Sequence, residues 1–199
     1  MIQGHRVTLR PFTRADLPAL RRWHADGTVM QYWGARLPLL TEDQFAADLA
    51  PGGRFATFDA RGTFCLCDAA GRPLGLVQYD GTAWGGGPRD RRAHLGILIG
   101  EPDAWGHGYG PAALVLLLNW LFNHQGYRRA WLTVQADNPR ACRAYEKVGF
   151  RREGTLRAHN FHDAHAHDEH LYGLLADEFN ALYRPDRTDW LVSGTPPDQ

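Results

Sequence analysis

The stretch Trp105-Gly106-His107-Gly108-Tyr109-Gly110-Pro111 decides the fold class, because it joins an apolar run to an apolar segment of helical character. Alternating glycines let the backbone turn several N–H groups toward one point. A helix that begins at Pro111 adds the positive end of its dipole there, and proline is tolerated at the first helical position. The segment therefore predicts a phosphate or pyrophosphate site, with a purely structural glycine-rich turn as the alternative.

Two common phosphate loops are excluded by the residues around these glycines. No Gly-Lys-Ser/Thr sequence follows the loop, which excludes a Walker-type nucleotide site. A dinucleotide-binding loop would need glycine at position 111, where this chain has proline. We therefore expect neither of these two sites.

The segments on both sides of the loop alternate between strand and helix patterns. Residues 93–99 form a near-continuous apolar run, which is typical of a central strand. Six more strands are predicted at 7–10, 63–68, 74–80, 130–134, 150–156 and 171–175, and helices at 13–24, 41–49, 111–123 and 139–148. This order predicts an α/β (α+β mixed sheet) fold, with a central mixed sheet of about six to seven strands flanked by helices.

The composition restricts the class of protein. The 199 residues are 44% hydrophobic and 22% charged, which is ordinary for a globular protein. Lys plus Arg and Asp plus Glu are both 22, so the chain lacks the net positive charge of a nucleic-acid binder. The uncharged segment 104–127 has an apolar part of only about a dozen residues, where a membrane span needs about 20. We expect no nucleic acid and no membrane as partner.

The cysteine content and the N-terminus indicate the compartment. Three cysteines, Cys65, Cys67 and Cys142, are too few for a disulfide scaffold and are odd in number. The first residues contain no apolar segment of the secretory type. A cytoplasmic location with reduced thiols is therefore expected.

A second motif, Asp137-Asn138-Pro139, opens the helix predicted over 139–148. Asn138 is expected at the N-cap and Pro139 at the first helical position, and Gly149 closes the helix. The helical spacing puts Tyr145 on the buried side together with Ala141, Ala144 and Val148. A phenol there must find a polar partner in the core or be left for a ligand.

In this order the motifs resemble the GNAT superfamily of acetyl-CoA-dependent N-acetyltransferases. The resemblance rests on residues 105–110, Asn138 and Tyr145-Glu146-Lys147-Val148-Gly149-Phe150; Trp105 and Ala112 depart from the residues most common at their positions. Residues 9–12, 152–157, 161–163 and 168–174 are similar to the ribosomal-protein N-terminal (Rim-type) branch. The resemblance covers residues 6–180 and implies one GNAT domain there. Residues 184–199 are rich in proline and aspartate, which predicts a loosely ordered C-terminal tail, with docking of Trp190 and Leu191 as the alternative.

The resemblance also implies which residues bind acetyl-CoA, the expected cosubstrate, without a metal. Asn138 would bond the pantetheine arm, and its role as helix cap is an equal alternative. Tyr145 would protonate the departing CoA thiolate. The backbone that pairs with the pantetheine arm would be that of Ile97, Leu98 and Ile99, and the pyrophosphate loop would comprise Trp105, Gly106, His107, Gly108, Tyr109 and Gly110.

The implied reaction is direct attack of a primary amine on the acetyl thioester within a ternary complex. The amine must be neutral to attack, so a base or a water relay has to remove its proton. Many members of the family carry a glutamate on the central strand, where this chain has His94. A histidine near neutrality suits a base, while water with backbone carbonyls, and a structural role for His94, are the alternatives.

Two further groups of residues offer other chemistry. The histidine-rich segment lacks the cysteine partners and the helical His-x₃-His spacing of a zinc site, so solvated loop histidines near the acceptor are expected. Cys142 as a covalent acetyl carrier has no assigned histidine and aspartate partners. The five histidines of that segment are His159, His162, His165, His167 and His170.

The sequence thus predicts an N-acetyltransferase acting on a primary amine, either a protein N-terminus or a small amine such as a polyamine or an antibiotic. A non-catalytic acetyl-CoA-binding or sensing module on the same fold is the alternative, since position 94 lacks the usual acidic residue. No motif identifies the acceptor, which we expect near Trp33, the helices after Asp16 and Thr41, and residues 158–168. The oligomeric state is open, a homodimer included.

Overall fold

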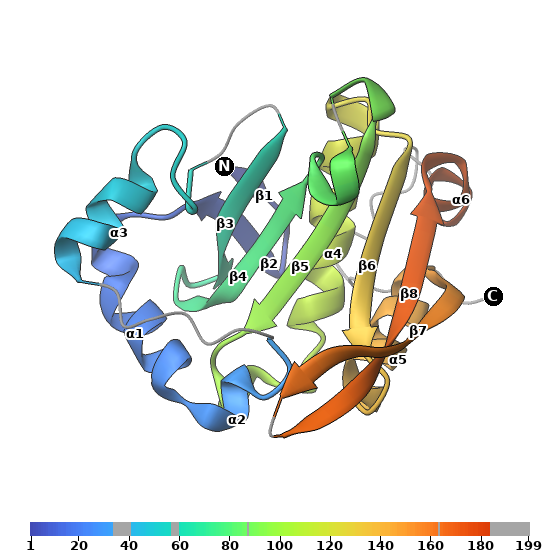
Figure 1. Ribbon diagram of the computed structural model, residues 1–199. Coiled ribbons are helices and arrows are strands. Elements are labelled where there is room, and N and C mark those ends of the chain that lie inside the picture. Colours follow the sequence, from blue (N-terminus) through green and yellow to red (C-terminus); the bar gives the residue numbers. More distant parts are fainter. Residues whose placement is uncertain (34–40, 57–59, 87, 163, 184–199) are drawn as a thin grey trace.

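A mixed sheet of eight strands organises the protein, in the order β1-β2-β3-β4-β5-β6-β8-β7 (Figure 1). The computed structural model describes residues 1–33, 41–56, 60–86, 88–162 and 164–183, and the predicted tail 184–199 lies outside these ranges. The α/β class is confirmed. The strand count exceeds the expected six to seven because β1 is too short to leave a pattern in the sequence. The strands are β1 (Ile2–Gln3), β2 (Val7–Pro11), β3 (Arg61–Asp68), β4 (Pro73–Asp80), β5 (Arg92–Ile99), β6 (Arg129–Gln135), β7 (Arg151–His162) and β8 (His165–Leu175).

The helices follow the predicted order. Asn138 caps α5 and Gly149 ends it, as predicted. The capping box of Thr41 and Gln44 is present at the start of α3, whereas the segment after Thr13 begins with a 3₁₀ turn before α1. The α-helices are α1 (Leu17–Ala25), α2 (Gly27–Met30), α3 (Glu42–Leu49), α4 (Tyr109–Asn119), α5 (Pro139–Val148) and α6 (Ala176–Leu182); shorter helical turns are Arg14–Asp16, Ala83–Gly85, Pro88–Asp90, Pro102–Ala104 and Trp120–His124.

Helix α4 forms the centre of the core on one face of the sheet (Figure 1). It starts two residues before the predicted Pro111, which therefore sits in the first turn, where a missing N–H costs no hydrogen bond. Every residue from Ala112 to Leu118 is buried, and these residues pack with Leu95 of β5 and Leu132 of β6. No helix within the described ranges combines the length and the apolar character that a membrane crossing requires.

The first helices lie beside the β2–β4 part of the sheet and bury a second apolar cluster. Leu20 and Trp23 of α1 and Phe45 of α3 pack there with Leu76 of β4 and Leu98 of β5. Gly100 is required by this packing, because a Cβ atom at that position would lie 2.3 Å from the Trp23 ring. The second cluster covers only the part of this face of the sheet that lies against these helices.

The histidine-rich segment is a strand pair rather than the loop that we expected. Strands β7 and β8 continue as a hairpin past the end of β6, with Asn160 opposite His167 and Phe161 opposite Ala166. Most side chains of this outer part are exposed, so the sequence shows no alternation of apolar and polar residues there. Backbone pairing in the hairpin, rather than burial of one face, accounts for the strands.

Candidate active site

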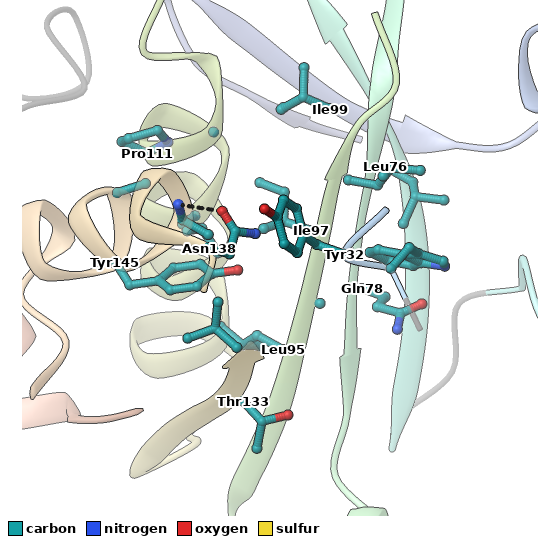
Figure 2. A pocket seen from close by; sticks show the side chains of 18 of the residues that line it. Tyr32, Leu76, Gln78, Leu95, Ile97, Ile99, Pro111, Thr133, Asn138 and Tyr145 are labelled. Carbon is teal, nitrogen blue, oxygen red and sulfur yellow. Dashed lines mark hydrogen bonds between the residues drawn. The ribbon is translucent and has the colours of Figure 1, made fainter. Parts of the chain in front are cut away.

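The site is built where β5 and β6 separate. These two strands pair in parallel at three positions only, and the last pair is His94 with Trp131. Beyond it, β5 continues along β4 to Ile99, and β6 continues along β8 to Gln135. A cavity of about 800 Å³ fills the wedge between them, and Figure 2 shows side chains from both sides of it.

The open edge of β5 presents backbone groups to this cavity. The Leu98 carbonyl points toward Gly75 of β4, while the Ile99 carbonyl accepts a 2.8 Å hydrogen bond from the Trp105 indole on the other side. Because backbone groups alternate in direction along a strand, those of Leu95 and Ile97 face the wedge. An extended ligand can therefore pair with the backbone at Ile97, as an added strand would, whereas Leu98 contributes its side chain.

The glycine loop leads into α4 at one end of the cavity. Gly106 and Gly108 both have φ near +80°, a left-handed conformation that glycine adopts without strain. Gly108 is the N-cap of α4, so the first N–H groups of the helix have no partner within it. The loop thus offers the anion site that the sequence predicts. His107 is exposed and does not line the cavity.

Arginines flank this loop, and the sequence analysis did not single them out. The Arg140 guanidinium lies 4.0 Å from the centre of the Trp105 ring. Arg6 donates a 2.7 Å hydrogen bond to the His107 carbonyl. Arg140 follows Pro139 in the first turn of α5, where a cation opposes the helix dipole. An arginine in the first turn destabilises the isolated helix, so its presence in the sequence indicates an anionic ligand at this position.

More cations continue from Arg140 along the same side of α5. Arg143 and Lys147 also line the cavity, and their spacing from Arg140 places the three residues on one helical face. CoA carries phosphates at its nucleotide end, so this face complements the ligand that the glycine loop would bind. The spacing of these three cations at i, i+3 and i+7 is visible in the sequence and could have predicted this face.

Asn138 serves as a helix cap and still faces the cavity. Its Oδ1 accepts a 3.1 Å hydrogen bond from the Ala141 N–H. Its Nδ2 makes no hydrogen bond to the described part of the chain, and Figure 2 shows this nitrogen directed into the cavity. The two roles considered for Asn138 are therefore compatible, because they use different atoms.

Tyr145 presents an unpartnered phenol to the same space. The residue is only 8% exposed, packed against Phe150 and Tyr172 with ring centres 6.2 Å away. Its hydroxyl makes no hydrogen bond to any described residue and points into the cavity (Figure 2). Burial raises the pKa of Tyr145 above its usual value near 10, so the phenol stays protonated and can donate.

His94 lies at the narrow end of the wedge. Its ring is 4.4 Å from that of Trp131, which in turn is 4.4 Å from Trp84. Asp80 of β4 is its cross-strand neighbour. Burial lowers the pKa of His94 below 6.5, and the charges of Asp80 and Glu169 oppose this shift in part. The imidazole is therefore neutral near pH 7 and can accept a proton.

The alternative chemistries find less support in the geometry. Cys142 does not line the cavity, and burial raises the pKa of its thiol, which disfavours a nucleophilic thiolate. Of the histidine segment, His167 lies 3.4 Å from Asp137 and His159 lies 3.9 Å from Glu169. Within the described residues, no group of three or more His, Cys, Asp or Glu side chains is placed to hold a metal ion.

The far wall of the cavity comes from α2 and the segment after it, where Trp33 lies as expected. Val29, Tyr32 and Trp33 line it. The Tyr32 hydroxyl donates a 3.3 Å hydrogen bond to the Asp137 carbonyl, which links this segment to the loop before α5. The cavity thus brings together all the predicted site residues except His107: Tyr145, His94, Ile97, Leu98, Ile99, Trp105, Gly106, Gly108, Tyr109, Gly110 and Asn138.

Comparisons with known proteins agree with this arrangement. The family model described as "Acetyltransferase (GNAT) domain" matches residues 6–151. Aminoglycoside N(6')-acetyltransferase type 1 of Klebsiella pneumoniae is 27% identical over 160 residues, 75% of this chain and 76% of the relative. Spermidine N(1)-acetyltransferase of Escherichia coli is 27% identical over 158 residues, 78% of each chain.

A solved structure shares the fold. The spermidine N-acetyltransferase of Vibrio cholerae, crystallised with CoA and spermine, superposes with a TM-score of 0.72 at 24% identity, covering 87% of this chain and 98% of that one. The relatives named here acetylate aminoglycosides or spermidine, so the narrower resemblance to the ribosomal-protein branch is not supported. The wider prediction is confirmed: the chain belongs to the GNAT family of acetyltransferases, enzymes that use acetyl-CoA.

Proposed function

We propose that the protein transfers the acetyl group of acetyl-CoA to a primary amine of a small molecule, by direct attack in a ternary complex. The observation that carries this proposal is the wedge between β5 and β6, where an open strand edge, a glycine loop and an unpartnered phenol meet in one cavity. If the glycine loop were only a structural turn, neither the open strand edge nor the unpartnered phenol would be needed beside it.

Binding of the cosubstrate is assigned to three parts of the cavity. The N–H groups of the loop from Gly106 to Gly110 bind the pyrophosphate, with Trp105 and Arg140 beside them. The Ile97 backbone and the Asn138 amide nitrogen bond the pantetheine arm. With the cosubstrate bound in this way, the proposed position of the thioester is between Tyr145 and His94, toward the narrow end of the wedge.

The chemistry then needs one base and one acid. His94, neutral because it is buried, takes the proton that the attacking amine loses, directly or through water. A C–N bond forms to the acetyl carbon and the C–S bond breaks. Tyr145, whose hydroxyl has no partner among the described residues, gives its proton to the sulfur that leaves.

A small amine is favoured over a protein N-terminus as acceptor. The relatives matched over most of their length are named for aminoglycosides and spermidine, which are small molecules with several amino groups. The acceptor side of the cavity is bounded by Tyr32 and Trp33. The alternative is a module that binds acetyl-CoA without turning it over. The two are distinguished by the CoA thiol, which an acetyltransferase releases and a binding module does not.

The test is a panel of amines with thiol release as readout, in the presence of EDTA. Spermidine, an aminoglycoside, an N-terminal peptide and a buffer blank are each supplied with acetyl-CoA, and the product is identified by mass. We expect amine-dependent thiol release, with one acetyl group added to a small amine. CoA binding without thiol release for any amine would contradict the proposed activity and support the alternative, a non-catalytic module that binds acetyl-CoA.

A further inference from the structure

One face of the sheet carries polar residues where it lines the cavity. Six of them share the face opposite α4, and we call them the polar floor: Thr63, Gln78, Asp80, His94, Thr133 and Glu169. The register sets Thr63 opposite Gln78 and Asp80 opposite His94. The other face of the same strands is apolar and packs on α4, with Phe64, Val77, Leu95 and Leu132 in the core. Polar groups in a cavity are costly unless something bonds them, so the polar floor suits a polar ligand.

Two carboxylates lie on this floor on different sides of His94. Asp80 accepts hydrogen bonds from the Thr82 N–H at 2.7 Å and the Thr82 hydroxyl at 2.6 Å, both at Oδ1. Glu169, whose side chain is 13% exposed, accepts one 3.2 Å bond from Asn160 and lies 3.9 Å from the His159 imidazole. Within the described part of the chain neither carboxylate forms an ion pair with arginine or lysine, and both keep the capacity to bind a cation.

The nearby arginines are committed to other groups. Arg61 donates a 2.8 Å hydrogen bond to the Gly52 carbonyl, and Arg54 pairs with Asp48. The cationic face of α5 lies toward the glycine loop, at the other end of the cavity from Asp80. Asp80 thus lies at the end of the cavity opposite the cationic face of α5, whereas Glu169, level with Gln135 at the end of β6, lies nearer to α5.

The spacing of the carboxylates calls for two cations rather than one. Asp80 is directly across from His94 on the neighbouring strand. Glu169 lies on β8, two strands from β5 and level with Gln135, four residues beyond Trp131. From the spacing and rise of strands, the backbone of Glu169 lies about 10 Å across the sheet and about 13 Å along it from the backbone of His94. A single ammonium group cannot contact both carboxylates.

We infer that Asp80 and Glu169 determine acceptor specificity, and that they select an acceptor with two or more ammonium groups. One amino group lies beside Asp80 and His94, where it loses its proton and reacts, and the second is held at Glu169. The unpartnered hydroxyl of Tyr145, 8% exposed in the same cavity, marks the reacting end. This inference rests on the proposed function and names its substrate class.

The test compares amines that share a reacting primary amine and differ in their other charges. Butylamine, 1,4-diaminobutane and spermidine are assayed for kcat/KM with the wild type, Glu169→Gln and Asp80→Asn, at low and high NaCl. Both substitutions keep the hydrogen-bond acceptor that Asn160 or Thr82 uses and remove only the charge. Asp177→Asn, at an exposed carboxylate of α6 outside the cavity, is the matched control.

We expect the wild type to prefer spermidine over butylamine by about tenfold or more, because a charge-assisted bond is lost with the monoamine. Glu169→Gln should lose most of that preference, Asp80→Asn should lower kcat/KM for every amine, and Asp177→Asn should change neither. Added salt should weaken the preference in the wild type, a readout that needs no variant to fold.

Three results would overturn the inference, and the failure of the inference alone is distinguishable from the failure of the proposed function. Turnover of butylamine and spermidine with equal kcat/KM, or a preference that Glu169→Gln leaves intact, contradicts the inference and leaves the acetyltransferase activity standing. The absence of thiol release with every amine contradicts the proposed function itself, and the inference fails with it.

Discussion

His94 and Trp131 face each other at the last paired position of β5 and β6, with their ring centres 4.4 Å apart. Past this pair the two strands separate and the cavity begins. Trp131 is itself packed against Trp84, so the His94 ring is held by an aromatic stack at the point where the wedge meets the polar floor.

Replacing His94 tests whether it is the base. Burial depresses the pKa of His94, so its neutral form persists below pH 6.5, and kcat/KM should fall only as the pH drops through that lowered pKa. The neighbouring charges of Asp80 and Glu169 limit the depression. His94→Gln, which cannot titrate, should lose this acidic limb and most of the rate in a pH–rate profile.

The acceptor amine produces a limb of its own at higher pH, because it must also lose a proton, and that limb should remain in His94→Gln. If the acidic limb stays at the same pH and the rate is nearly intact, the proton leaves through water and His94 is structural. CoA affinity, measured on the same variant, shows whether the strand is still correctly placed.

Tyr145→Phe tests the acid. The change keeps the ring that packs against Phe150 and Tyr172 and removes only the hydroxyl that faces the cavity. We expect kcat to fall by about 10- to 1,000-fold, the range for a lost proton donor, with little change in CoA affinity. Steady-state kinetics with a saturating amine provide the measurement.

A neighbouring tyrosine supplies the control. Tyr172 donates a 2.8 Å hydrogen bond to Glu146 and does not line the cavity. Tyr172→Phe should lower the free energy of unfolding by about 1 kcal/mol and leave kcat close to the wild-type value. Equal turnover in Tyr145→Phe and the wild type would return Tyr145 to a packing role.

Gly108→Asp tests the anion site at the start of α4. Any side chain at φ +80° is strained, its Cβ would lie 3.3 Å from Arg6, and an aspartate adds negative charge where the pyrophosphate binds. We expect the loss of measurable CoA binding in equilibrium dialysis. Gly71→Asp, at φ +84° in an exposed turn with open space around it, imposes the same strain away from the cavity and should bind CoA normally.

Arg140→Gln tests the cationic side of the CoA site. Removing the charge that lies over Trp105 should raise the KM for acetyl-CoA by about 5- to 20-fold, with kcat unchanged at saturation. Arg151, an exposed arginine of β7 paired with Glu178, is the control, and Arg151→Gln should leave the KM unaltered. A KM that does not respond to Arg140→Gln would assign this arginine to packing on Trp105 alone.

The parts of the fold that the sequence predicted are those with local signals. Asn138, Pro139 and Gly149 delimit α5 through capping chemistry, which acts within a few residues. The apolar run at residues 93–99 predicted the central strand β5 from local composition alone. These signals need no knowledge of distant residues.

The parts that were missed depend on residues far apart in the sequence. The separation of β5 and β6 after His94 arises from pairing between three strands, and no single segment encodes it. Glu169 reaches the cavity because β8 pairs with β6. The outer part of the β7–β8 hairpin lacks an apolar face, so its strands left no periodic pattern to read.

Binding of acetyl-CoA in the wedge between β5 and β6, through the protein's own residues, is the basis of the proposed function. Titration calorimetry of CoA into protein treated with EDTA tests it most directly, with NAD and ATP as competing ligands. We expect one CoA bound per chain, without added metal, and no comparable heat from NAD or ATP. Absence of CoA binding at millimolar concentration, with binding of NAD or ATP instead, would contradict it.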